Sequence, residues 1–407
     1  MELPFNNSFM RDLKRILVIH SEGNAANNPC LKAMFDYFGK CGWHCDVVSR
    51  ERDIPQPYFP NVSWRLDGHI WWRLKAIAIN VLCSRIISRL MVWCRWRSRP
   101  RGRYNLIIGV DRQGLIEAYY LSRMMKIPYF LISFEIMFEK ETFLRFKRLE
   151  REASKHVETW IVQDELRAEK LAQENHLDRS KAFYLPVASR GLGTFDNDRL
   201  RDRLGIPKEK HVIIAMGSIG IWTMIDEVLT SLPSWPEDWV LIIHDRYGFK
   251  KRQIADLFKK KPDIGTRLFL SDRAAEYVDD LGDILNGVSY GLAFYRSVAG
   301  HRYWGDNLKF LGRSSGKIAT YFRYGIPVIT NEIGIMADDI KTYGLGHVVD
   351  SPMAIPALLQ NSGLMDQTKN YNRCRQYFSE KLDFDLYAEH LAARLNNKTS
   401  TLFSSGN

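Results

Sequence analysis

One stretch of twenty residues is more informative than any other part of this 407-residue chain: Leu311-Gly-Arg-Ser-Ser-Gly-Lys-Ile-Ala-Thr-Tyr-Phe-Arg-Tyr-Gly-Ile-Pro-Val-Ile-Thr330. It predicts a Ser/Gly loop, a helix that ends at Gly325, and a strand that starts around a proline. Backbone amides at the start of such a helix, together with its dipole, favour a phosphate at Ser314 to Lys317, and Lys317 adds a full positive charge. An ordinary capped helix without a ligand is the alternative.

The spacing excludes a phosphate-binding loop of the Walker A type. That motif needs four residues between its first glycine and the Gly-Lys pair, and a Ser or Thr directly after the lysine. Here three residues separate Gly312 from Gly316, and Ile318 stands where the metal-binding hydroxyl would be.

Short apolar runs alternate with amphipathic segments in two series along the chain. The first series predicts strands at 15–20, 42–48, 106–109, 128–134, 159–162 and 182–185, and helices at 30–40, 114–125, 140–157 and 166–174. The second predicts strands at 211–216, 239–244, 267–270, 290–294, 326–330 and 346–349, and helices at 222–232, 250–260, 274–284 and 317–324. This alternation is typical of parallel sheets covered by helices. The fold class is therefore α/β, with two Rossmann-like, doubly wound domains and a ligand cleft between them.

The length also favours two domains, because one domain usually takes about 100–200 residues. We assign 1–187 to the N-terminal domain, with a basic, tryptophan-rich insertion at about 68–103, and 211–380 to the C-terminal domain. Helical and strand periodicity fades at 188–210, which we expect to be a linker. We expect a helix at 381–395 that packs back toward the N-terminal domain, and a mobile polar tail at 396–407.

The chain carries eleven more basic than acidic residues, which favours anionic partners such as nucleotides, nucleic acid or acidic lipid headgroups. We recognise no nucleic-acid-binding module and expect no nucleic acid partner. Residues 1–15 lack the apolar core of a secretory signal. The uncharged stretch 76–84 is far shorter than the ~18 residues of a spanning helix. We therefore expect a cytoplasmic protein.

The six cysteines show no disulfide framework, and one group of them suggests a metal site. Cys41, His44 and Cys45 are close in sequence, but no second Cys/His pair lies at a matching spacing. We expect reduced, structural thiols and no bound metal.

The stretch at 311–330 resembles the Lys-x-x-x-Tyr-x-x-x-Gly-x-Pro-Val-Ile signature in the C-terminal domain of many GT-B glycosyltransferases, especially those related to glycosyltransferase family four. The residues that match are Lys317, Tyr321, Gly325, Pro327, Val328 and Ile329. The order of elements from residue 15 to about 395 is also similar to that family. The resemblance implies an N-terminal acceptor-binding domain, a C-terminal domain that binds a nucleotide-sugar donor, and no cofactor.

The resemblance also implies where the donor binds. The loop at Gly217 and the strand end at Leu270 are similar to the family's loop and base contacts, and we expect the ribose near Thr320. The diphosphate would lie at the start of the signature helix, with further charge from Arg246, Arg296 or Arg313. The donor-binding candidates are Gly217, Ser218, Arg246, Leu270, Ser271, Arg296, Ser314, Ser315, Gly316, Lys317 and Thr320.

Two departures from the family pattern bear on the mechanism. Retaining members usually have a glutamate in the signature helix where this chain has Thr320, and a hydroxyl cannot accept two hydrogen bonds as a carboxylate does. Residues 218–223 contain neither Arg nor Lys, which many members place there to hold the diphosphate. A retaining outcome is therefore implied by the family alone.

Glu135 and His20 are the catalytic candidates. Glu135 stands where many family members have a histidine, and its carboxylate could orient or deprotonate an acceptor hydroxyl, or merely cap the next helix. His20 ends the first predicted strand and would face the cleft, either as a working residue or as a satisfied, non-catalytic histidine. His244 and Asp245 end another strand and are expected to line the cleft.

The insertion contains an amphipathic helix. Apolar residues recur at helical spacing from Cys83 to Cys94, with serines and arginines opposite them and tryptophans on either side. Such a helix could rest on an anionic bilayer, or it could pack on the first domain with its arginines solvated. The expected membrane contacts are Trp71, Trp72, Arg85, Arg89, Trp93, Arg95, Trp96 and Arg97.

These observations predict a peripheral enzyme on the cytoplasmic face of the membrane. It would transfer one sugar from a nucleotide-sugar to a glycan or lipid-linked acceptor, in the synthesis of a bacterial surface polysaccharide such as lipopolysaccharide or capsule. A GT-B nucleotide-sugar epimerase is one alternative, although it needs neither an acceptor nor a membrane-facing helix. A non-catalytic GT-B scaffold or binding subunit is another, favoured by Thr320 and by the missing Arg/Lys pair.

Overall fold

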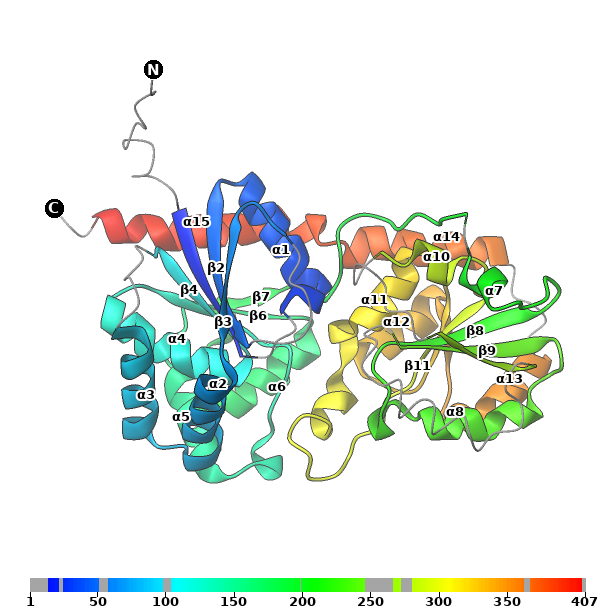
Figure 1. The fold of residues 1–407 in the computed structure, drawn as a ribbon, viewed down its shortest axis with the longest axis horizontal. Helices are drawn as coiled ribbons and strands as arrows, with labels where there is room; N and C mark the ends of the chain where they lie inside the picture. The colour runs from blue at the N-terminus through cyan, green and yellow to red at the C-terminus, as the bar shows by residue number, and fades with distance from the viewer. Residues whose placement is uncertain are drawn as a thin grey trace, which may run out of the picture. The chain divides into compact units, whose positions relative to one another are not determined.

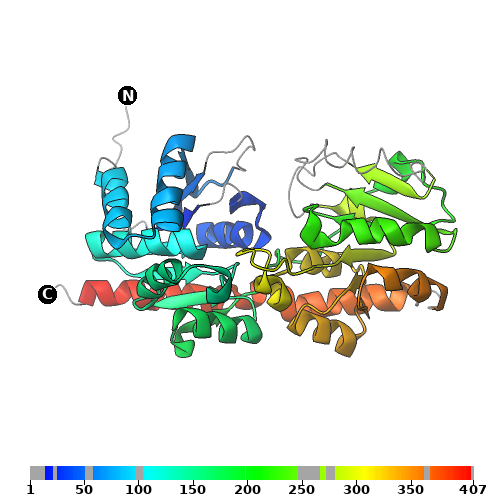
Figure 2. The ribbon, with the colours of Figure 1, turned by 90° about the horizontal axis from the view of Figure 1, so that it is seen from below.

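The computed structural model describes residues 14–21, 25–50, 58–97, 104–197, 199–245, 266–271, 280–361 and 367–404, without the side chains of 26, 361, 367–368 and 398–404. By its internal contacts the chain divides into two units. The first consists of Met1–Val162, Ala168–Leu185 and Tyr387–Asn407, and the second of Gln163–Arg167 and Pro186–Leu386. Each unit is built on its own parallel sheet with helices on both faces (Figures 1 and 2).

The sheet of the first unit has seven parallel strands in the order β3-β2-β1-β4-β5-β6-β7. The interior strand β1 pairs with β2 and β4, and Ile16–Ile19 are buried on both faces because helices cover both sides of the sheet. The strands are β1 (Lys14–His20), β2 (Trp43–Arg50), β3 (Val62–Asp67), β4 (Leu106–Val110), β5 (Tyr129–Ile132), β6 (Thr159–Val162) and β7 (Ala182–Tyr184).

The helices of the first unit begin where the sequence supplies caps. At the start of α1 the side chain of Asn28 accepts hydrogen bonds from the amides of Cys30 and Leu31, and Pro29 suits the first helical position. The helices are α1 (Pro29–Lys40), α2 (His69–Ala76), the π-helix η2 (Ile77–Leu82), α3 (Arg85–Arg97), α4 (Asp111–Met125), α5 (Leu144–Ser154), α6 (Glu165–Asn175) and α15 (Asp385–Ser404).

The sheet of the second unit has six parallel strands in the order β10-β9-β8-β11-β12-β13. The strands are β8 (His211–Met216), β9 (Trp239–His244), β10 (Leu268–Ser271), β11 (Tyr290–Ala293), β12 (Val328–Thr330) and β13 (Gly346–Val348). The helices and short turns around them include α7 (Leu200–Arg203), η5 (Ile221–Thr223), α8 (Ile225–Ser231), α10 (Gly282–Leu285), η7 (Asp306–Phe310), η8 (Gly312–Ser314), α11 (Gly316–Arg323), α12 (Ile335–Tyr343), α13 (Ile355–Asn361) and α14 (Gln367–Tyr377).

The predicted α/β class with two doubly wound parallel sheets is confirmed. The sequence did not predict β3, because Val62–Asp67 is a half-exposed edge strand that lacks a continuous apolar run. The predicted helix at 250–260 and most of the one at 274–284 lie outside the described residues, as does Arg246.

Two expected segment boundaries are wrong. The presumed linker 188–210 belongs to the second unit, because Ala188, Leu200 and Ile206 are buried in that unit's hydrophobic core. The presumed tail 396–407 is helical as far as Ser404, as the end of α15. Extending a helix that is already formed costs little, so a polar sequence can continue one that buried Leu391 and Leu395 anchor.

Candidate functional site

The start of α11 has the geometry of an anion-binding helix end. Ser315 is the N-cap: its side chain accepts a 3.4 Å hydrogen bond from the amide of Ile318. The hydroxyl of Tyr295, which follows β11, lies 2.9 Å from Oγ of Ser315 and fixes its orientation. Ser315 is buried, whereas Ser314, Gly316 and Lys317 are half-buried. The amides and dipole of this first turn therefore point toward a partly open space.

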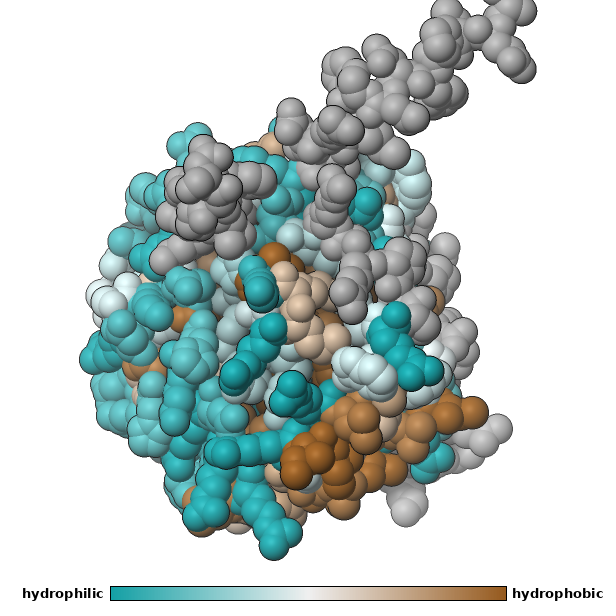
Figure 3. Space-filling view, turned by 90° about the vertical axis from the view of Figure 1, so that its left-hand side faces the viewer, coloured by the Kyte–Doolittle hydropathy of each residue, from teal (hydrophilic) through white to brown (hydrophobic). Residues whose placement is uncertain are grey.

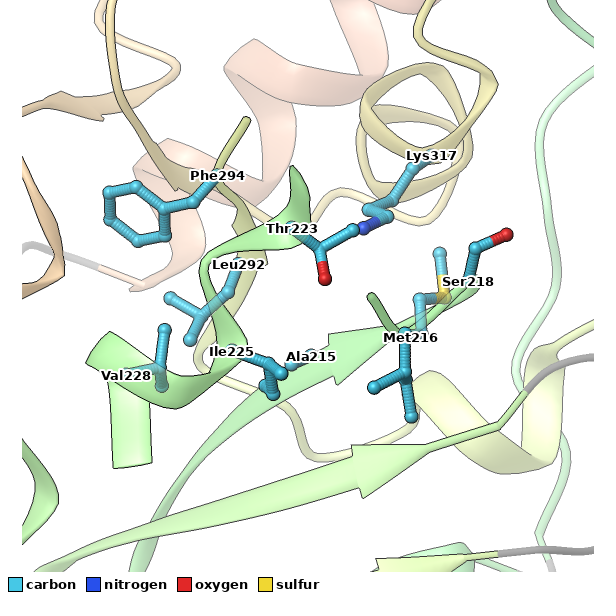
Figure 4. A pocket seen from close by; sticks show the side chains of 10 residues that line it. Ala215, Met216, Ser218, Thr223, Ile225, Val228, Leu292, Phe294 and Lys317 are labelled. Carbon is cyan, nitrogen blue, oxygen red and sulfur yellow. The ribbon is translucent and has the colours of Figure 1, made fainter. Parts of the chain in front are cut away.

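Lys317 lies across the glycine loop that follows β8. Gly217 has a φ of +101°, and its amide donates to the carbonyl of His244 at the end of β9 (3.2 Å). Figure 4 shows Lys317 reaching from α11 toward the loop that carries Thr223. The two segments border a small pocket whose floor is apolar, lined by Ala215, Met216, Ser218, Ile219, Thr223, Ile225, Val228, Leu292, Phe294 and Lys317.

The signature tyrosine holds α11 on the sheet. Tyr321 is fully buried; its hydroxyl donates to the carbonyl of Ile214 (3.1 Å) and accepts from the amide of Met216 (3.3 Å). Its ring packs where a side chain on Gly291 would be, since a Cβ there would lie 2.5 Å from the ring. Tyr321 therefore fixes the distance between the helix start and the glycine loop.

The signature glycine ends the helix. Gly325 has a φ of +76°, and the amides of Gly325 and Ile326 donate to the carbonyls of Phe322 and Tyr321, as in a Schellman motif. A Cβ on Gly325 would lie 2.2 Å from the ring of Tyr371. The predicted stop at Gly325 is confirmed.

The arginines proposed to assist Lys317 have other partners. Arg296 forms an ion pair with Glu227, and Arg313 forms one with Asp339 at 3.0 Å. Burial alone would lower the pKa of Arg313, but Tyr377 and Asp339 outweigh it and raise that pKa above its ordinary value. Of the predicted cations within the described residues, Lys317 is the one that borders the pocket.

Two other predicted donor contacts, Thr320 and Ser271, are buried and hydrogen-bonded within the unit. Thr320 is buried and donates to the carbonyl of Gly316 (2.7 Å), one helical turn earlier. Ser271 lies at the end of β10, 2.9 Å from Nδ1 of buried His244. Leu270 is half-buried beside them. His244, Asp245 and Ser271 thus form the carboxyl edge of β9 and β10 next to the glycine loop.

A row of aromatic rings, which the sequence analysis did not identify, lies next to Lys317. His301 stacks on Trp304 (ring centroids 4.2 Å apart), Trp304 on Trp222 (6.1 Å) and Trp222 on Tyr295 (6.2 Å). The ammonium of Lys317 is 5.3 Å from the ring centroid of Tyr295. The sequence contained a signal for this row, because Trp222 follows the predicted strand at 211–216 and Tyr295 follows the one at 290–294.

In the first unit, the catalytic candidates lie at the carboxyl edge of the sheet. His20 ends β1, in register with Val110 of β4, and is almost fully buried. Glu135 follows β5 and is half-buried. Asp111, which was not predicted, begins α4 with a φ of +52°, and its Oδ1 accepts hydrogen bonds from the amides of Phe134 (2.7 Å) and Glu135 (3.0 Å). Asp111 therefore positions the Glu135 backbone beside the end of β4.

Among the described residues, no three His, Cys, Asp or Glu side chains come together as metal ligands would. Cys41 is exposed, Cys45 is buried, and Nε2 of His44 lies 2.9 Å from the hydroxyl of Ser63.

Solved structures with the same architecture cover almost the whole chain. The structure of HepE from Anabaena, in complex with UDP and glucose, has a TM-score of 0.68 at 12% identity and covers 94% of this chain and 100% of its own. Sucrose-phosphate synthase from Thermosynechococcus elongatus has a TM-score of 0.69 at 12% identity, covering 97% and 100%. WaaG, a glycosyltransferase involved in lipopolysaccharide biosynthesis, has a TM-score of 0.63 at 14% identity, covering 93% and 98%. The chain has the GT-B fold.

The family comparison concerns the C-terminal part of this GT-B chain. Residues 274–394 match the family described as the glucosyltransferase 3-like, C-terminal domain. No curated protein sequence matches the chain significantly. The resemblance to GT-B glycosyltransferases that the sequence indicated is thus confirmed, and the matched segment includes the whole of α11.

The insertion in the first GT-B domain is held by a buried ionic cluster. Lys75 of α2 lies 3.5 Å from Asp67 and 3.3 Å from Glu117 of α4, and Arg95 of α3 forms ion pairs with the same two carboxylates. The indole N–H of Trp96 also donates to Glu117 (2.8 Å). Arg95 and Trp96 are buried, so their predicted role as membrane contacts is wrong. Their side chains satisfy carboxylates in the domain interior instead of meeting solvent.

The ionic cluster turns the apolar stripe of α3 outward. Ser88, Val92, Arg95 and Trp96 form the buried face, whereas Ile86 is 79% exposed and Leu90 is 54% exposed. The neighbouring α2 and η2, together with Leu66 of β3, add further exposed apolar side chains. Figure 3 shows a brown apolar area bordered by teal polar side chains. We call this set the apolar face: Leu66, Ile70, Trp71, Leu74, Ile77, Val81, Leu82, Ile86, Ile87, Leu90 and Trp93.

The predicted arginines border the apolar face. Arg85, Arg89 and Arg97 are exposed, Arg85 pairs with Glu152, and the guanidinium of Arg97 is 5.2 Å from the ring centroid of Trp93. Trp72 is half-buried: its indole N–H donates to the carbonyl of Ser21 (2.8 Å). None of the helices in the described ranges combines the length and the apolar composition that crossing a bilayer requires.

Proposed function

We propose that this GT-B protein is a glycosyltransferase that transfers a sugar from a nucleotide-sugar donor to a glycan or lipid-linked acceptor. The observation that carries the proposal is the position of Lys317, on the first turn of α11 and across the loop at Gly217. A capped helix start and a lysine over a glycine loop suit a nucleoside diphosphate. The likeness to HepE, which was solved with UDP and glucose, supports UDP-glucose as the first donor to test.

In the proposed reaction, an acceptor hydroxyl oxygen forms a bond to the anomeric carbon of the donor sugar. The bond from that carbon to the β-phosphate oxygen breaks, and its electron pair leaves with the nucleoside diphosphate. Lys317 and the amides of the α11 start stabilise the negative charge that develops on this leaving group, so the proposal includes no metal ion. Glu135 or His20 would orient the acceptor hydroxyl and accept its proton as the new bond forms. The family resemblance favours a retaining outcome.

The first test is a thermal-shift screen of the purified protein with UDP, GDP, ADP and CMP, each as free nucleotide and as sugar conjugate. A ligand that binds the folded state raises the melting temperature by mass action. We expect a selective rise with one nucleotide class. No rise with any of them would contradict a donor site and would favour the scaffold alternative.

Turnover assays separate the enzyme alternatives. Lys317→Ala should lower sugar transfer by about a hundredfold or more, because it removes a charge that acts on the leaving group. Lys341→Ala is the matched control, since Lys341 is an exposed lysine of α12 paired with Glu332. A variant Lys317→Ala with near-normal transfer would exclude Lys317 from the mechanism. Conversion of the donor sugar without any acceptor would indicate the epimerase, and loss of transfer with EDTA would contradict metal independence.

We further propose that the apolar face docks on an anionic membrane from the cytoplasmic side, where a lipid-linked acceptor of surface polysaccharide synthesis would be presented. Exposed apolar patches of this extent mark interaction sites. The apolar face includes Trp71 and Trp93 and is bordered by Arg89 and Arg97. This combination of apolar, tryptophan and arginine side chains suits the interface of an acidic bilayer better than an uncharged protein partner.

Vesicle flotation tests the membrane proposal. The protein should float with vesicles that contain phosphatidylglycerol, and binding to pure phosphatidylcholine vesicles should be weak and less sensitive to salt. Ile86→Asp combined with Leu90→Asp should abolish flotation without lowering the melting temperature. Met353→Asp, at a comparably exposed apolar residue of the second unit, is the control. Two results would contradict the proposal. One is equal flotation of the double variant and of Met353→Asp, and the other is equal flotation of the wild-type protein with neutral and with anionic vesicles.

A further inference from the structure

The row of rings formed by His301, Trp304, Trp222 and Tyr295 runs from the hydrophobic core to the surface: Tyr295 belongs to the core of the second unit, and Trp222 packs against that core. Trp304 is 38% exposed, and His301 and Trp222 are half-buried. Neighbouring planes are nearly parallel, at 8°, 25° and 19° along the row. We call this set the aromatic row. Its side chains come from two loops of the second unit, and its outer end at Trp304 is open to solvent, whereas Tyr295 at its inner end is buried.

The loop that carries the outer rings is ordered by its own hydrogen bonds. The amide of Val298 donates to the carbonyl of Trp304 (2.6 Å), and the amide of Trp304 donates to Nδ1 of His301 (2.9 Å). The amide of Arg296 donates to the carbonyl of Trp222 (2.9 Å), which ties this loop to the one after β8. The rings are therefore oriented before any ligand arrives, which lowers the entropy cost of binding.

The inner end of the aromatic row meets the candidate diphosphate site. The hydroxyl of Tyr295 lies 2.9 Å from Oγ of Ser315, the N-cap of α11, and its ring lies under the ammonium of Lys317. A nucleotide-sugar has its sugar bonded directly to the terminal phosphate of the diphosphate. A ligand whose phosphate is held by Lys317 must therefore place its sugar ring within a few bond lengths of this position.

We propose that the outer part of the aromatic row, Trp304 with His301 and Trp222, is a stacking platform for a pyranose ring. A pyranose presents a face of C–H groups that packs on an aromatic π-face, where the ring quadrupole is negative. His301 covers one face of Trp304, so the sugar would pack on the part of Trp304 that is open to solvent. Its hydroxyls point sideways and stay hydrated or hydrogen-bonded. This inference rests on the proposed transferase function and adds to it a residue set that would recognise the sugar. The pyranose is either that of the donor or that of the acceptor.

The affinities of UDP and UDP-glucose for Trp304→Ala, measured by calorimetry, distinguish these sources. If the donor sugar stacks, UDP-glucose affinity falls about five- to tenfold, the range expected for one lost aromatic contact, while UDP affinity is unchanged. If the acceptor sugar stacks, both affinities stay the same and the KM for the acceptor rises without a change in donor KM. Either result supports the platform.

Three outcomes overturn the proposal. An equal fall of UDP and UDP-glucose affinity would mean that the rings contact the nucleotide rather than a sugar. No change in either affinity or in acceptor KM would mean that Trp304 has only a structural role. If the wild-type protein binds neither UDP nor UDP-glucose, nor any other nucleotide-sugar in the thermal screen, the proposed function itself is wrong and the platform fails with it.

Two further variants guard against misfolding as the cause. Trp304→Phe keeps an aromatic face in the row and should retain most of the UDP-glucose affinity that Trp304→Ala loses. Tyr343→Ala removes an exposed aromatic side chain of α12, outside the row, and should change no affinity. Melting curves of all three variants verify that they are folded. Loss of UDP-glucose affinity in Tyr343→Ala as well would overturn the assignment to the aromatic row.

Discussion

The side chain of Lys317 runs directly over Gly217. A Cβ placed on Gly217 would lie 3.2 Å from Cε and 3.9 Å from Nζ of Lys317, closer to Cε than most real Cβ contacts. The glycine therefore serves two purposes: it adopts a φ of +101°, and it leaves the space through which the lysine reaches the pocket.

Gly217→Ala should therefore impair donor binding. The added methyl group displaces Lys317, and we expect donor affinity to fall about tenfold, together with a loss of stability of about 1–3 kcal/mol from backbone strain. Gly191→Ala is the control, because Gly191 also has a positive φ (+62°) but has no atom within 4 Å of its added Cβ. Calorimetric donor affinities and melting curves compare the two. Equal losses of donor affinity would mean that strain, and not the crowding of Lys317, is responsible.

Tyr321→Phe should destabilise the second unit. The substitution removes a buried hydroxyl that accepts from the amide of Met216 and donates to the carbonyl of Ile214, at a cost of about 1–3 kcal/mol. Because Met216 precedes Gly217, donor affinity should fall as well. Tyr343→Phe, at an exposed tyrosine, should leave the unfolding free energy unchanged in urea titrations. A Tyr321→Phe variant as stable as wild type would refute the anchoring role.

The sequence predicted the strands that are buried and apolar, since such runs depend on local composition. β1, β4 and β8 were found within a residue or two of their bounds. β3 was missed because an edge strand needs no apolar face. Helix periodicity also correctly identified the amphipathic helix of the insertion, but it could not identify its buried side. The side of the helix that is buried is set by the ion pairs of Arg95 with Asp67 and Glu117, which lie close to Arg95 in the folded chain but far from it in sequence.

In the candidate site, too, features that depend on local sequence were predictable and features that depend on distant residues were not. The place of Lys317 at the start of α11 and the helix stop at Gly325 were predictable, because a capped helix start and a helix stop are local features. The binding of a phosphate by Lys317 stays a prediction. The partners of Arg296 and Arg313 were not, because Glu227 and Asp339 lie far away in sequence. The aromatic row combines side chains from two loops, so no single window of sequence contains it.

The buried ionic cluster predicts a specific acid sensitivity. Burial alone would raise the pKa of Glu117, but Arg95 and Lys75 outweigh it and lower that pKa to about 2. A carboxyl group with a lowered pKa stabilises the fold fully above the unfolded value of 4.5, and this contribution is lost as the pH falls from there toward about 2. The free energy of unfolding, measured by denaturant titration across this range, should fall steeply in the wild-type protein.

Glu117→Gln should remove much of that slope. At neutral pH the variant leaves Arg95 and Lys75 facing Asp67 alone, and we expect it to lose about 3–5 kcal/mol. Glu389→Gln, at an exposed carboxylate of α15, should change neither the stability nor its pH dependence. An unchanged slope in Glu117→Gln would assign the acid sensitivity to other carboxylates.

Thr320 provides the sharpest test of the donor geometry. Its hydroxyl already donates to the carbonyl of Gly316, and only 3% of the residue is exposed, so it has little left to offer a ribose. Thr320→Val keeps the shape and should change donor affinity less than about threefold, with a stability change within about 1 kcal/mol. A tenfold loss of donor affinity would restore Thr320 as a ribose contact. Thr320→Glu introduces the residue that retaining family members usually carry, but it buries a longer, charged side chain where no room is open. It should therefore lower the melting temperature without raising activity, because it places a charged carboxylate in the buried interior.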